Sequence, residues 1–300
     1  MFPELSLEGN TAIVTGGAQG IGGGIARQLA ADGAQVLIVD INEEVANANA
    51  EHIRAAGGTV SCMLGDVVQE EVANAMVARA VEEYGRLDIL VQNAFSGAGG
   101  RGSAVDIEPA DWRAGMASLV DALYLGARAA IPAIEASGAP VGRPATEVGR
   151  IVNISSAHGL MQAAGWMVYE VGKTAVIGLT RQLAVEYGPV GITVNAIAPG
   201  HILTENLEKS WAAEGNDKGR RLFELQYPVR RMGKPEDVAA AVAFLCAPEA
   251  SFITGVVLPV DGGHTIQLQE NVVMDLKDYI VENPDLRTYF DVPGAGVPRH

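Results

Sequence analysis

The chain has 300 residues, of which 48% are hydrophobic, 36 are glycine and two are cysteine, and its formal net charge is −15. The apolar fraction is typical of a globular protein, and the acidic balance disfavours nucleic-acid binding, which needs clustered lysine and arginine. The first ten residues carry no basic side chain and no long apolar run, and Cys62 and Cys246 lie in separate apolar stretches. We therefore expect a cytoplasmic protein with free thiols and with no signal peptide, membrane partner or nucleic-acid partner.

Short β-branched runs alternate with helical patterns along the chain. The predicted strands are residues 11–15, 35–40, 59–64, 87–93, 150–156, 192–198 and 256–260, and the predicted helices are residues 20–32, 43–56, 69–84, 109–136, 166–187 and 235–246. Strands that are apolar throughout, each followed by a helix, imply a parallel sheet covered on both faces. Right-handed crossovers make this an α/β doubly wound parallel sheet, the Rossmann fold, in a single domain.

Two segments interrupt the alternation. Residues 137–149 are rich in glycine and proline, and we expect an exposed loop at the amino edge of the sheet, away from the ligand-binding edge. Residues 264–300 form a C-terminal extension in which apolar residues recur at helical spacing between 271 and 282. An amphipathic helix must bury one face, so this extension packs either on its own domain or on a neighbouring subunit.

A glycine-rich segment follows the first strand and opens the first helix. Residues 15–22 read Thr-Gly-Gly-Ala-Gln-Gly-Ile-Gly. Gly16 permits a tight turn, Gly20 allows the backbone to approach a pyrophosphate, and Gly22 allows the helix to pack closely on the sheet. The helix N-terminus then offers N–H groups and the positive end of its dipole to an anion. The segment predicts a dinucleotide site.

Polar residues at the ends of the next strands extend this site. Asp40 ends the second strand, where a carboxylate accepts hydrogen bonds from ribose hydroxyls and repels a 2′-phosphate. No arginine or lysine occurs between residues 34 and 51, so NAD is favoured over NADP. Asp66 ends the third strand, with a helix N-cap as its alternative role, and Asn93 with Ala94 ends the fourth.

A second group of residues indicates proton-transfer chemistry. Tyr169 and Lys173 lie four residues apart in a helical pattern and therefore share one face. An ammonium group and an oxidised nicotinamide near the tyrosine would lower the pKa of its hydroxyl from about 10. Ser156 ends the strand at 150–156, where it either hydrogen-bonds a substrate oxygen or caps a turn.

Residues 7–263 resemble the classical short-chain dehydrogenase/reductase family. The resemblance rests on the glycine segment, Ser156, Tyr169 and Lys173, on the run Asn-Ala-Ile-Ala-Pro-Gly at residues 195–200, and on Asp-Gly-Gly at residues 261–263. It implies that residues 1–263 form an NAD-binding catalytic domain that exchanges a hydride between NAD(H) and a secondary alcohol or ketone. Tyr169 would be the general acid/base, Lys173 would bind the nicotinamide ribose and lower the tyrosine pKa, and Ser156 would hold the reacting oxygen. The implied cofactor contacts, besides Tyr169 and Lys173, are Gly16, Gln19, Gly20, Ile21, Gly22, Asp40, Asp66, Val67, Asn93, Ala94, Pro199, Gly200, Ile202 and Thr204.

The sequence departs from the family pattern at two positions. Phe95 stands where the family usually has glycine, which places bulk near the cofactor or substrate. Leu119, flanked by Ser118, stands where the family usually has an asparagine that supports a proton relay to the lysine. This departure motivates an alternative function, an NAD-binding sensor or scaffold with weak or lost turnover. The close spacing of Tyr169 and Lys173, together with Ser156, argues against the enoyl reductases, which space these residues farther apart.

The substrate pocket is expected at the carboxyl edge of the sheet, in loops 95–107, 157–167 and 200–227. Their large apolar residues suit an apolar ketone or alcohol as the small-molecule substrate. The candidate substrate contacts are Phe95, His158, Met161, Trp166, His201 and Trp211. The five histidines are scattered without ligand spacing, so no metal site is expected. The family resemblance implies a homotetramer or homodimer.

Overall fold

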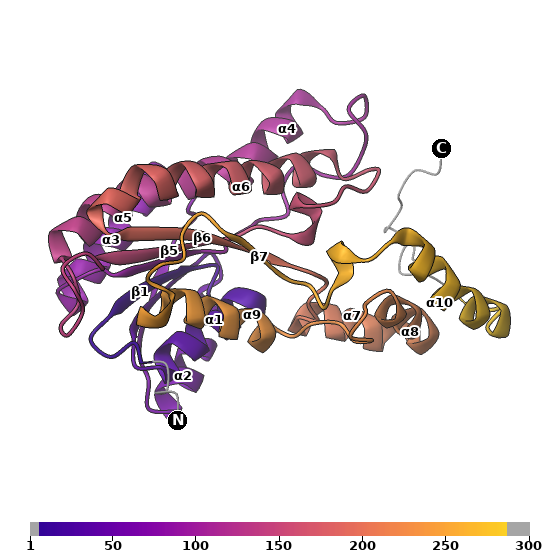
Figure 1. The fold of residues 1–300 in the computed structure, drawn as a ribbon, viewed down its shortest axis with the longest axis horizontal. Helices are drawn as coiled ribbons and strands as arrows, with labels where there is room; N and C mark the ends of the chain where they lie inside the picture. The colour runs from indigo at the N-terminus through magenta and orange to yellow at the C-terminus, as the bar shows by residue number, and fades with distance from the viewer. Residues whose placement is uncertain (1–5, 287–300) are drawn as a thin grey trace.

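Seven parallel strands form one sheet in the order β3-β2-β1-β4-β5-β6-β7 (Figure 1). The computed structural model describes residues 6–286, apart from the side chains of residues 210, 213, 214 and 275, so part of the predicted C-terminal extension lies outside the described residues. The strands are β1 Thr11–Thr15, β2 Gln35–Asp40, β3 Thr59–Leu64, β4 Ile89–Gln92, β5 Gly149–Ile154, β6 Ile192–Pro199 and β7 Val257–Val260. The predicted doubly wound parallel sheet is confirmed.

Helices cover both faces of the sheet, with α1, α2 and α9 on one side and α3, α5 and α6 on the other (Figure 1). The α-helices are α1 Gly20–Ala31, α2 Glu43–Ala55, α3 Glu70–Tyr84, α4 Pro109–Met116, α5 Ala122–Ser137, α6 Met167–Tyr187, α7 Glu205–Glu214, α8 Asp217–Leu225, α9 Pro235–Cys246 and α10 Gln269–Glu282. This arrangement follows from strand geometry, because successive side chains point to opposite faces. In β1, Val14 packs in the layer of α1 and α9, whereas its neighbour Ile13 packs in the layer of α3 and α5.

The region between β6 and α9 differs from the sequence prediction. Residues 200–227 were expected to be loop, but they contain α7 and α8, so that prediction was wrong. Neither helix shows a long apolar stripe, and local capping helps to define both. Glu205 and Glu208 lie in the first turn of α7, and the Asn216 side chain caps α8 by accepting from the Gly219 backbone N–H at 3.0 Å.

The predicted helix at 109–136 is interrupted by a π-helical turn, Ala117–Asp121, between α4 and α5. The combined run, Pro109–Ser137, is the only stretch within residues 6–286 that is long and apolar enough to cross a membrane. Half of its most apolar window is buried inside the fold. Alanine and isoleucine side chains of α5 pack on the sheet there, so burial in the core accounts for its apolar character.

The C-terminal extension begins with a helix. The predicted helix at 271–282 corresponds to α10, which lies beside α8 at one end of the molecule (Figure 1). The Tyr279 hydroxyl donates to the Lys218 carbonyl at 3.1 Å, and the Lys218 ammonium pairs with the Asp285 carboxylate at 2.6 Å. Val273, Met274 and Val281 remain largely exposed. Within the described residues, α10 therefore packs on its own chain through one side only.

Candidate active site

The carboxyl ends of β1 and β4 are joined by a cluster of hydrogen bonds. Strand order reverses between these two strands, and doubly wound sheets bind ligands in the crevice that such a reversal creates. The Asn93 backbone N–H donates to the Thr15 hydroxyl at 3.0 Å, and the Asn93 side-chain amide donates to the carbonyls of Thr15 and Gly16 at 3.1 and 3.0 Å. The Ala94 N–H also donates to the Thr15 hydroxyl. Asn93 and Ala94 therefore fix the glycine turn against β4.

The glycine turn is as tight as its sequence predicts. Gly16 and Gly20 have φ values of +65° and +56°, which side chains disfavour. A Cβ on Gly22 would lie 2.1 Å from the Gly16 carbonyl oxygen and 2.4 Å from the Asn93 amide nitrogen. Gly22 is therefore required by the turn itself, whereas the sequence interpretation assigned it to helix–sheet packing. Asn49 of α2 also holds the turn, because its amide donates to the Gly17 carbonyl at 2.9 Å, a contact that no sequence motif indicated.

A carboxylate occupies the N-terminus of α1. The Gly20 backbone N–H donates to Glu205 Oε2 at 2.9 Å, and the N-cap residue Gln19 provides no side-chain cap. Glu205 is the first residue of α7, and the side chain of its neighbour Thr204 lies 3.2 Å from the position of a Cβ on Gly20. The segment that follows β6 therefore rests on the glycine turn, and one of its acidic groups occupies the place expected for an anionic ligand.

Two acidic residues end the strands beside the turn. The Asp40 carboxylate accepts from the Ala18 N–H and the Asn42 N–H, both at 3.0 Å, so its two oxygens are held in place at the end of β2. Asp66 is exposed after β3, next to Val67, and accepts from the Val68 N–H at 3.2 Å. The N-cap of α3 is Gln69, so Asp66 does not serve the capping role considered for it.

Ser156, Tyr169 and Lys173 line one cavity of about 800 Å³ at the carboxyl edge of the sheet. Ser156 follows β5, and its hydroxyl accepts from the His158 N–H at 3.1 Å. Tyr169 and Lys173 project from the first two turns of α6. The Lys173 ammonium donates to the Ile154 carbonyl at 2.8 Å and lies 5.8 Å from the centroid of the Tyr169 ring. The same cavity is lined by Ile21, Asn93, Pro199, Gly200 and Ile202.

Burial is the largest cause of the pKa shifts of Tyr169, Lys173 and His201. Removal from water raises the pKa of Tyr169 above its usual value, and a hydrogen bond from Ser156 opposes this rise. Burial also lowers the pKa of Lys173 to about 8. His201, which lines the same cavity, has its pKa lowered to about 4 by burial and by nearby His158, so its imidazole is neutral at neutral pH. For the protein's own groups, burial therefore outweighs the expected lowering of the tyrosine pKa, and the hydroxyl holds its proton at neutral pH.

Aromatic side chains surround Tyr169. The rings of Phe95, His158 and Trp166 have centroids 5.4, 5.8 and 6.1 Å from that of Tyr169. These three residues line the cavity together with Met161 and His201. Trp211 does not, because it is buried in α7 away from the cavity wall.

Leu119 and Ser118 lie in the π-helical turn behind α6. Leu119 is buried against Gly172, where a Cβ would come within 2.5 Å of the leucine side chain. The Ser118 hydroxyl accepts from the Ser96 N–H and hydroxyl at 3.2 and 3.0 Å. Ser118 therefore holds the loop after β4 and is not bonded to Lys173.

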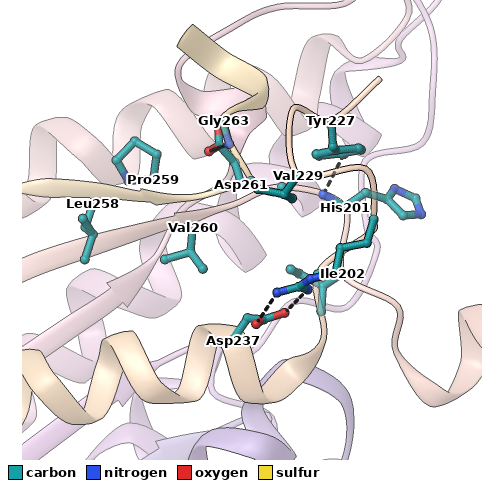
Figure 2. Close-up of a pocket in the computed structure, with 14 residues that line it drawn as sticks. His201, Ile202, Tyr227, Val229, Asp237, Leu258, Pro259, Val260, Asp261 and Gly263 are labelled. Carbon is teal, nitrogen blue, oxygen red and sulfur yellow. Dashed lines mark hydrogen bonds and ion pairs between the residues drawn. The ribbon is translucent and has the colours of Figure 1, made fainter. Parts of the chain in front are cut away.

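A smaller cavity of about 340 Å³ adjoins the first between the ends of β6 and β7 and the start of α9 (Figure 2). Figure 2 shows the Tyr227 hydroxyl bonded to the His201 N–H, with Asp237 below them. The Asp237 carboxylate pairs with Arg231 at 2.6 Å. His201, Ile202 and Tyr227 line both cavities, so this segment is a shared wall. Among the described residues, no group of three or more histidine, cysteine or acidic side chains is placed to hold a metal ion.

Comparison with known proteins identifies the family. A family model described as Enoyl-(Acyl carrier protein) reductase, one of the models of the short-chain dehydrogenase/reductase family, matches residues 16–265. The chain is 34% identical over 266 residues to 7α-hydroxysteroid dehydrogenase of Escherichia coli K12, an alignment that covers 88% of this chain and 98% of the relative. It is 36% identical over 262 residues to an uncharacterised oxidoreductase of Thermotoga maritima, covering 87% and 99%. The chain belongs to the short-chain dehydrogenase/reductase family.

Solved structures support the same family assignment. A 7α-hydroxysteroid dehydrogenase in complex with NADH and 7-oxo glycochenodeoxycholic acid superposes with a TM-score of 0.77 at 34% identity, covering 88% of this chain and 98% of the other. A putative NAD(P)-dependent gluconate 5-dehydrogenase from Beutenbergia cavernae with bound NADP gives 0.75 at 32% identity, covering 87% and 99%. The chain is thus an oxidoreductase of a family that uses a nicotinamide dinucleotide, and the resemblance inferred from its motifs is confirmed.

The buried Lys173 gives a stability prediction. Its folded pKa lies below the unfolded value of 10.5, so the cost of burying the charge is fully present below pH 8 and fades as pH rises towards 10.5. Relative to Lys173→Met, the wild-type protein should gain about 2 kcal/mol of unfolding free energy between pH 7 and pH 9.5. Denaturant unfolding of both proteins at the two pH values measures this, and a difference that does not change with pH would contradict it.

Proposed function

We propose that the protein is an NAD-dependent dehydrogenase or reductase that interconverts a secondary alcohol and a ketone, with Ser156, Tyr169 and Lys173 as its catalytic residues. The observation that carries the proposal is their convergence on one cavity at the carboxyl edge of the sheet. The cavity also presents Phe95, Met161, Trp166 and Phe223, which suit a largely apolar substrate body.

The proposed reaction transfers a hydride between the substrate carbon and the nicotinamide, and a proton between the substrate oxygen and Tyr169. A bound NAD⁺ would supply the hydride acceptor for alcohol oxidation. In that direction a deprotonated Tyr169 would accept the hydroxyl proton of the alcohol and then release it to solvent, so that the alcohol and NAD⁺ would give ketone, NADH and a proton. In ketone reduction, Tyr169 donates its proton to the carbonyl oxygen. Because burial raises the pKa of its hydroxyl, Tyr169 holds the proton needed for reduction at neutral pH. Ser156 would hold the reacting oxygen. Lys173, which donates to the Ile154 carbonyl and lies 5.8 Å from the centroid of the Tyr169 ring, would hold the nicotinamide ribose.

The spacing of these residues favours carbonyl chemistry over the enoyl reduction named in the description of the family model. Tyr169 and Lys173 lie four residues apart on α6, and Ser156 lies in the same cavity. A serine hydroxyl beside a tyrosine hydroxyl suits an oxygen that gains or loses a proton directly. We therefore assign the reaction to the CH–OH group.

We propose NAD as the cofactor, with its pyrophosphate at the N-terminus of α1 and its adenosine ribose at Asp40. The support is the tight turn at Gly16 and Gly20, the Gly20 N–H that donates to a carboxylate at the N-terminus of α1, and the two-point fixation of the Asp40 carboxylate. Each Asp40 oxygen has a further lone pair for a ribose hydroxyl, and its charge repels a 2′-phosphate. Gln19, Asp66, Val67, Asn93, Ala94 and Thr204 complete the proposed contacts.

A second candidate function is an NAD-binding sensor or scaffold with weak turnover. The observation that favours it is Leu119, which places an apolar group against Gly172 where the family supports its proton relay. Turnover that depends on Tyr169 would exclude this second candidate.

We further propose a cytoplasmic homotetramer or homodimer. Tyr124 on α5 and Val185 on α6 are 53% and 75% exposed, which supports a subunit contact on this face of the molecule. The catalytic domain would span residues 1–263, with the extension from residue 264 packed on its own domain or a neighbouring subunit.

Removal of the Tyr169 hydroxyl tests the assigned chemistry. Tyr169→Phe should lower kcat about 10²–10⁴-fold on any secondary alcohol or ketone that the wild type converts, because the variant has no group to exchange the proton. Tyr187→Phe, at the opposite end of α6 from Tyr169, is the matched control and should keep wild-type kcat. Wild-type turnover by Tyr169→Phe would refute the assignment.

The charge of Asp40 tests the choice of cofactor. Asp40→Asn keeps the shape of the side chain but removes its charge, so the preference for NAD(H) over NADP(H) should fall at least about tenfold in kcat/KM. Asp111→Asn, an exposed carboxylate on α4, should leave the preference unchanged. A wild-type protein that already prefers NADP(H) would contradict the ribose argument.

Glu205 tests the position of the pyrophosphate. Its carboxylate and a phosphate oxygen compete for the Gly20 N–H, so Glu205→Gln should bind NADH several-fold more tightly, by removing a charge that repels the ligand. Glu208→Gln, one turn farther along α7, serves as the control. Equilibrium titration of NADH fluorescence gives both dissociation constants, and an unchanged or weaker affinity in Glu205→Gln places the pyrophosphate elsewhere.

A further inference from the structure

The C-terminal extension contributes residues to the active-site cavity of its own chain. His264 and Gln269 line the cavity of about 800 Å³ that holds the proposed catalytic residues. We call the extension wall the set of lining residues from α8, from the segment after it and from the extension: Phe223, Gln226, Tyr227, His264 and Gln269. The family model ends its match at residue 265, so Gln269 lies beyond the part of the chain that the model describes. This wall is therefore partly specific to this chain.

The start of the extension is fixed against the segment after α8. The Asp261 carboxylate accepts from the backbone N–H and from the hydroxyl of Thr265, at 2.8 and 2.6 Å, which closes a short turn at the end of β7. His264 lies within this turn, and the centroid of its ring is 4.9 Å from that of Tyr227. The Tyr227 hydroxyl accepts from the His201 N–H at 3.0 Å. The extension wall is thereby tied to the ends of β6 and β7.

Helix α10 holds α8 in the extension wall, since the two helices lie side by side (Figure 1). The Gln267 side-chain amide donates to the Gln226 carbonyl just after α8, and the Lys218 ammonium pairs with the Asp285 carboxylate beyond α10. Phe223 follows Lys218 by five residues, so at about 100° per residue their side chains lie on different sides of α8. One side of α8 therefore contributes Phe223 to the cavity while another is held by the extension.

Gln269 gives the extension wall a neutral hydrogen-bonding group. It is the first residue of α10, is exposed and lines the cavity. A carboxamide can donate and accept hydrogen bonds without carrying a charge. None of the five residues of the extension wall is an acid, a lysine or an arginine. A carboxylate or an ammonium group would lose its hydration there without gaining an ion-pair partner, whereas an amide or a hydroxyl loses less hydration and gains a matching partner.

We propose that the C-terminal extension forms a wall of the substrate site in its own subunit, and that Gln269 binds a neutral hydrogen-bonding group, an amide or a hydroxyl, carried by the ketone or alcohol. The proposal rests on the proposed function and narrows its substrate class. Gln269 acts as a specificity-determining residue, and Lys218 with Asp285 holds α8 on the extension.

Ketones that differ at one end test the proposal by kinetics. Methyl ketones of increasing chain length are assayed with NADH in three series, whose other end is a methyl group, a carboxamide or a carboxylate. At one chain length the oxo amide should show kcat/KM about two- to tenfold above the plain ketone, the range of one neutral hydrogen bond. Gln269→Leu should remove this advantage by raising KM for the oxo amide, with the kinetics of the plain ketone unchanged.

Asn271→Leu is the matched control. It replaces an exposed carboxamide two residues farther along α10, on a different face of the helix, and should change none of these constants. A preference for the oxo acid over the oxo amide, or an equal loss in both variants, overturns the proposal.

A binding measurement separates this proposal from the proposed function. The NAD⁺-loaded protein cannot reduce a ketone, so calorimetric titration with the same compounds reports binding alone. The oxo amide should bind the wild type about two- to tenfold more tightly than the plain ketone does, and should lose this advantage in Gln269→Leu. Equal binding of both compounds by the wild type overturns the proposal. Selective binding without turnover of any compound of the panel with NADH leaves the extension wall standing and refutes the proposed function.

Mixed oligomers test which subunit the extension serves. Chains with Tyr169→Phe and chains with Gln269→Leu are co-expressed with different tags and purified through both tags. Every intact Tyr169 then shares its chain with the Gln269→Leu change, so the preference for the oxo amide should stay absent. Tags that never purify together show chains that do not assemble, in which the extension serves its own chain alone. Return of the preference in mixed oligomers means that the extension serves a neighbouring subunit, which overturns the proposal.

Discussion

The close approach of the glycine turn to Asn93 is the contact on which the rest of the site depends. Strand order reverses between β1 and β4, and the Asn93 amide bridges the gap by donating to the Thr15 and Gly16 carbonyls. That bridge leaves no room for a Cβ on Gly22. With the turn held there, α1 starts with its N–H groups directed at the carboxyl edge. The same edge receives Ser156 from β5 and Tyr169 from α6.

Burial then sets the chemistry of the groups that meet at this edge. Tyr169 retains its proton because it is taken out of water, and Lys173 is held by a carbonyl rather than by a carboxylate. Among residues 6–286, no aspartate or glutamate lines the cavity that these residues share, although the chain is strongly acidic overall. The buried Glu170 carboxylate contacts the cavity lining through His158 and the Ala163 N–H.

The sequence predicted the fold closely because its strands are apolar throughout and its helices are amphipathic; most predicted strand and helix bounds differ from the observed ones by no more than two residues. Ser156, Tyr169 and Lys173, which were named from motifs, line one cavity because strand ends converge at one edge, and their roles stay a prediction. Contacts between distant segments could not be predicted. The Glu205 carboxylate accepts a hydrogen bond from Gly20, 185 residues away in the sequence. Glu170 contacts His158 across a loop whose sequence shows no helical or strand periodicity. Trp211 was predicted to line the pocket because it is a large apolar residue in the segment after β6. In α7 its side chain is buried in the interior instead.

The most direct test of the central claim is a crystal structure of the protein with NADH. The account predicts that a pyrophosphate oxygen replaces Glu205 as the acceptor of the Gly20 N–H, that the adenosine ribose contacts Asp40, and that the nicotinamide lies in the cavity shared by Ser156, Tyr169 and Lys173. A dinucleotide bound away from the glycine turn, or a nicotinamide outside that cavity, would contradict it.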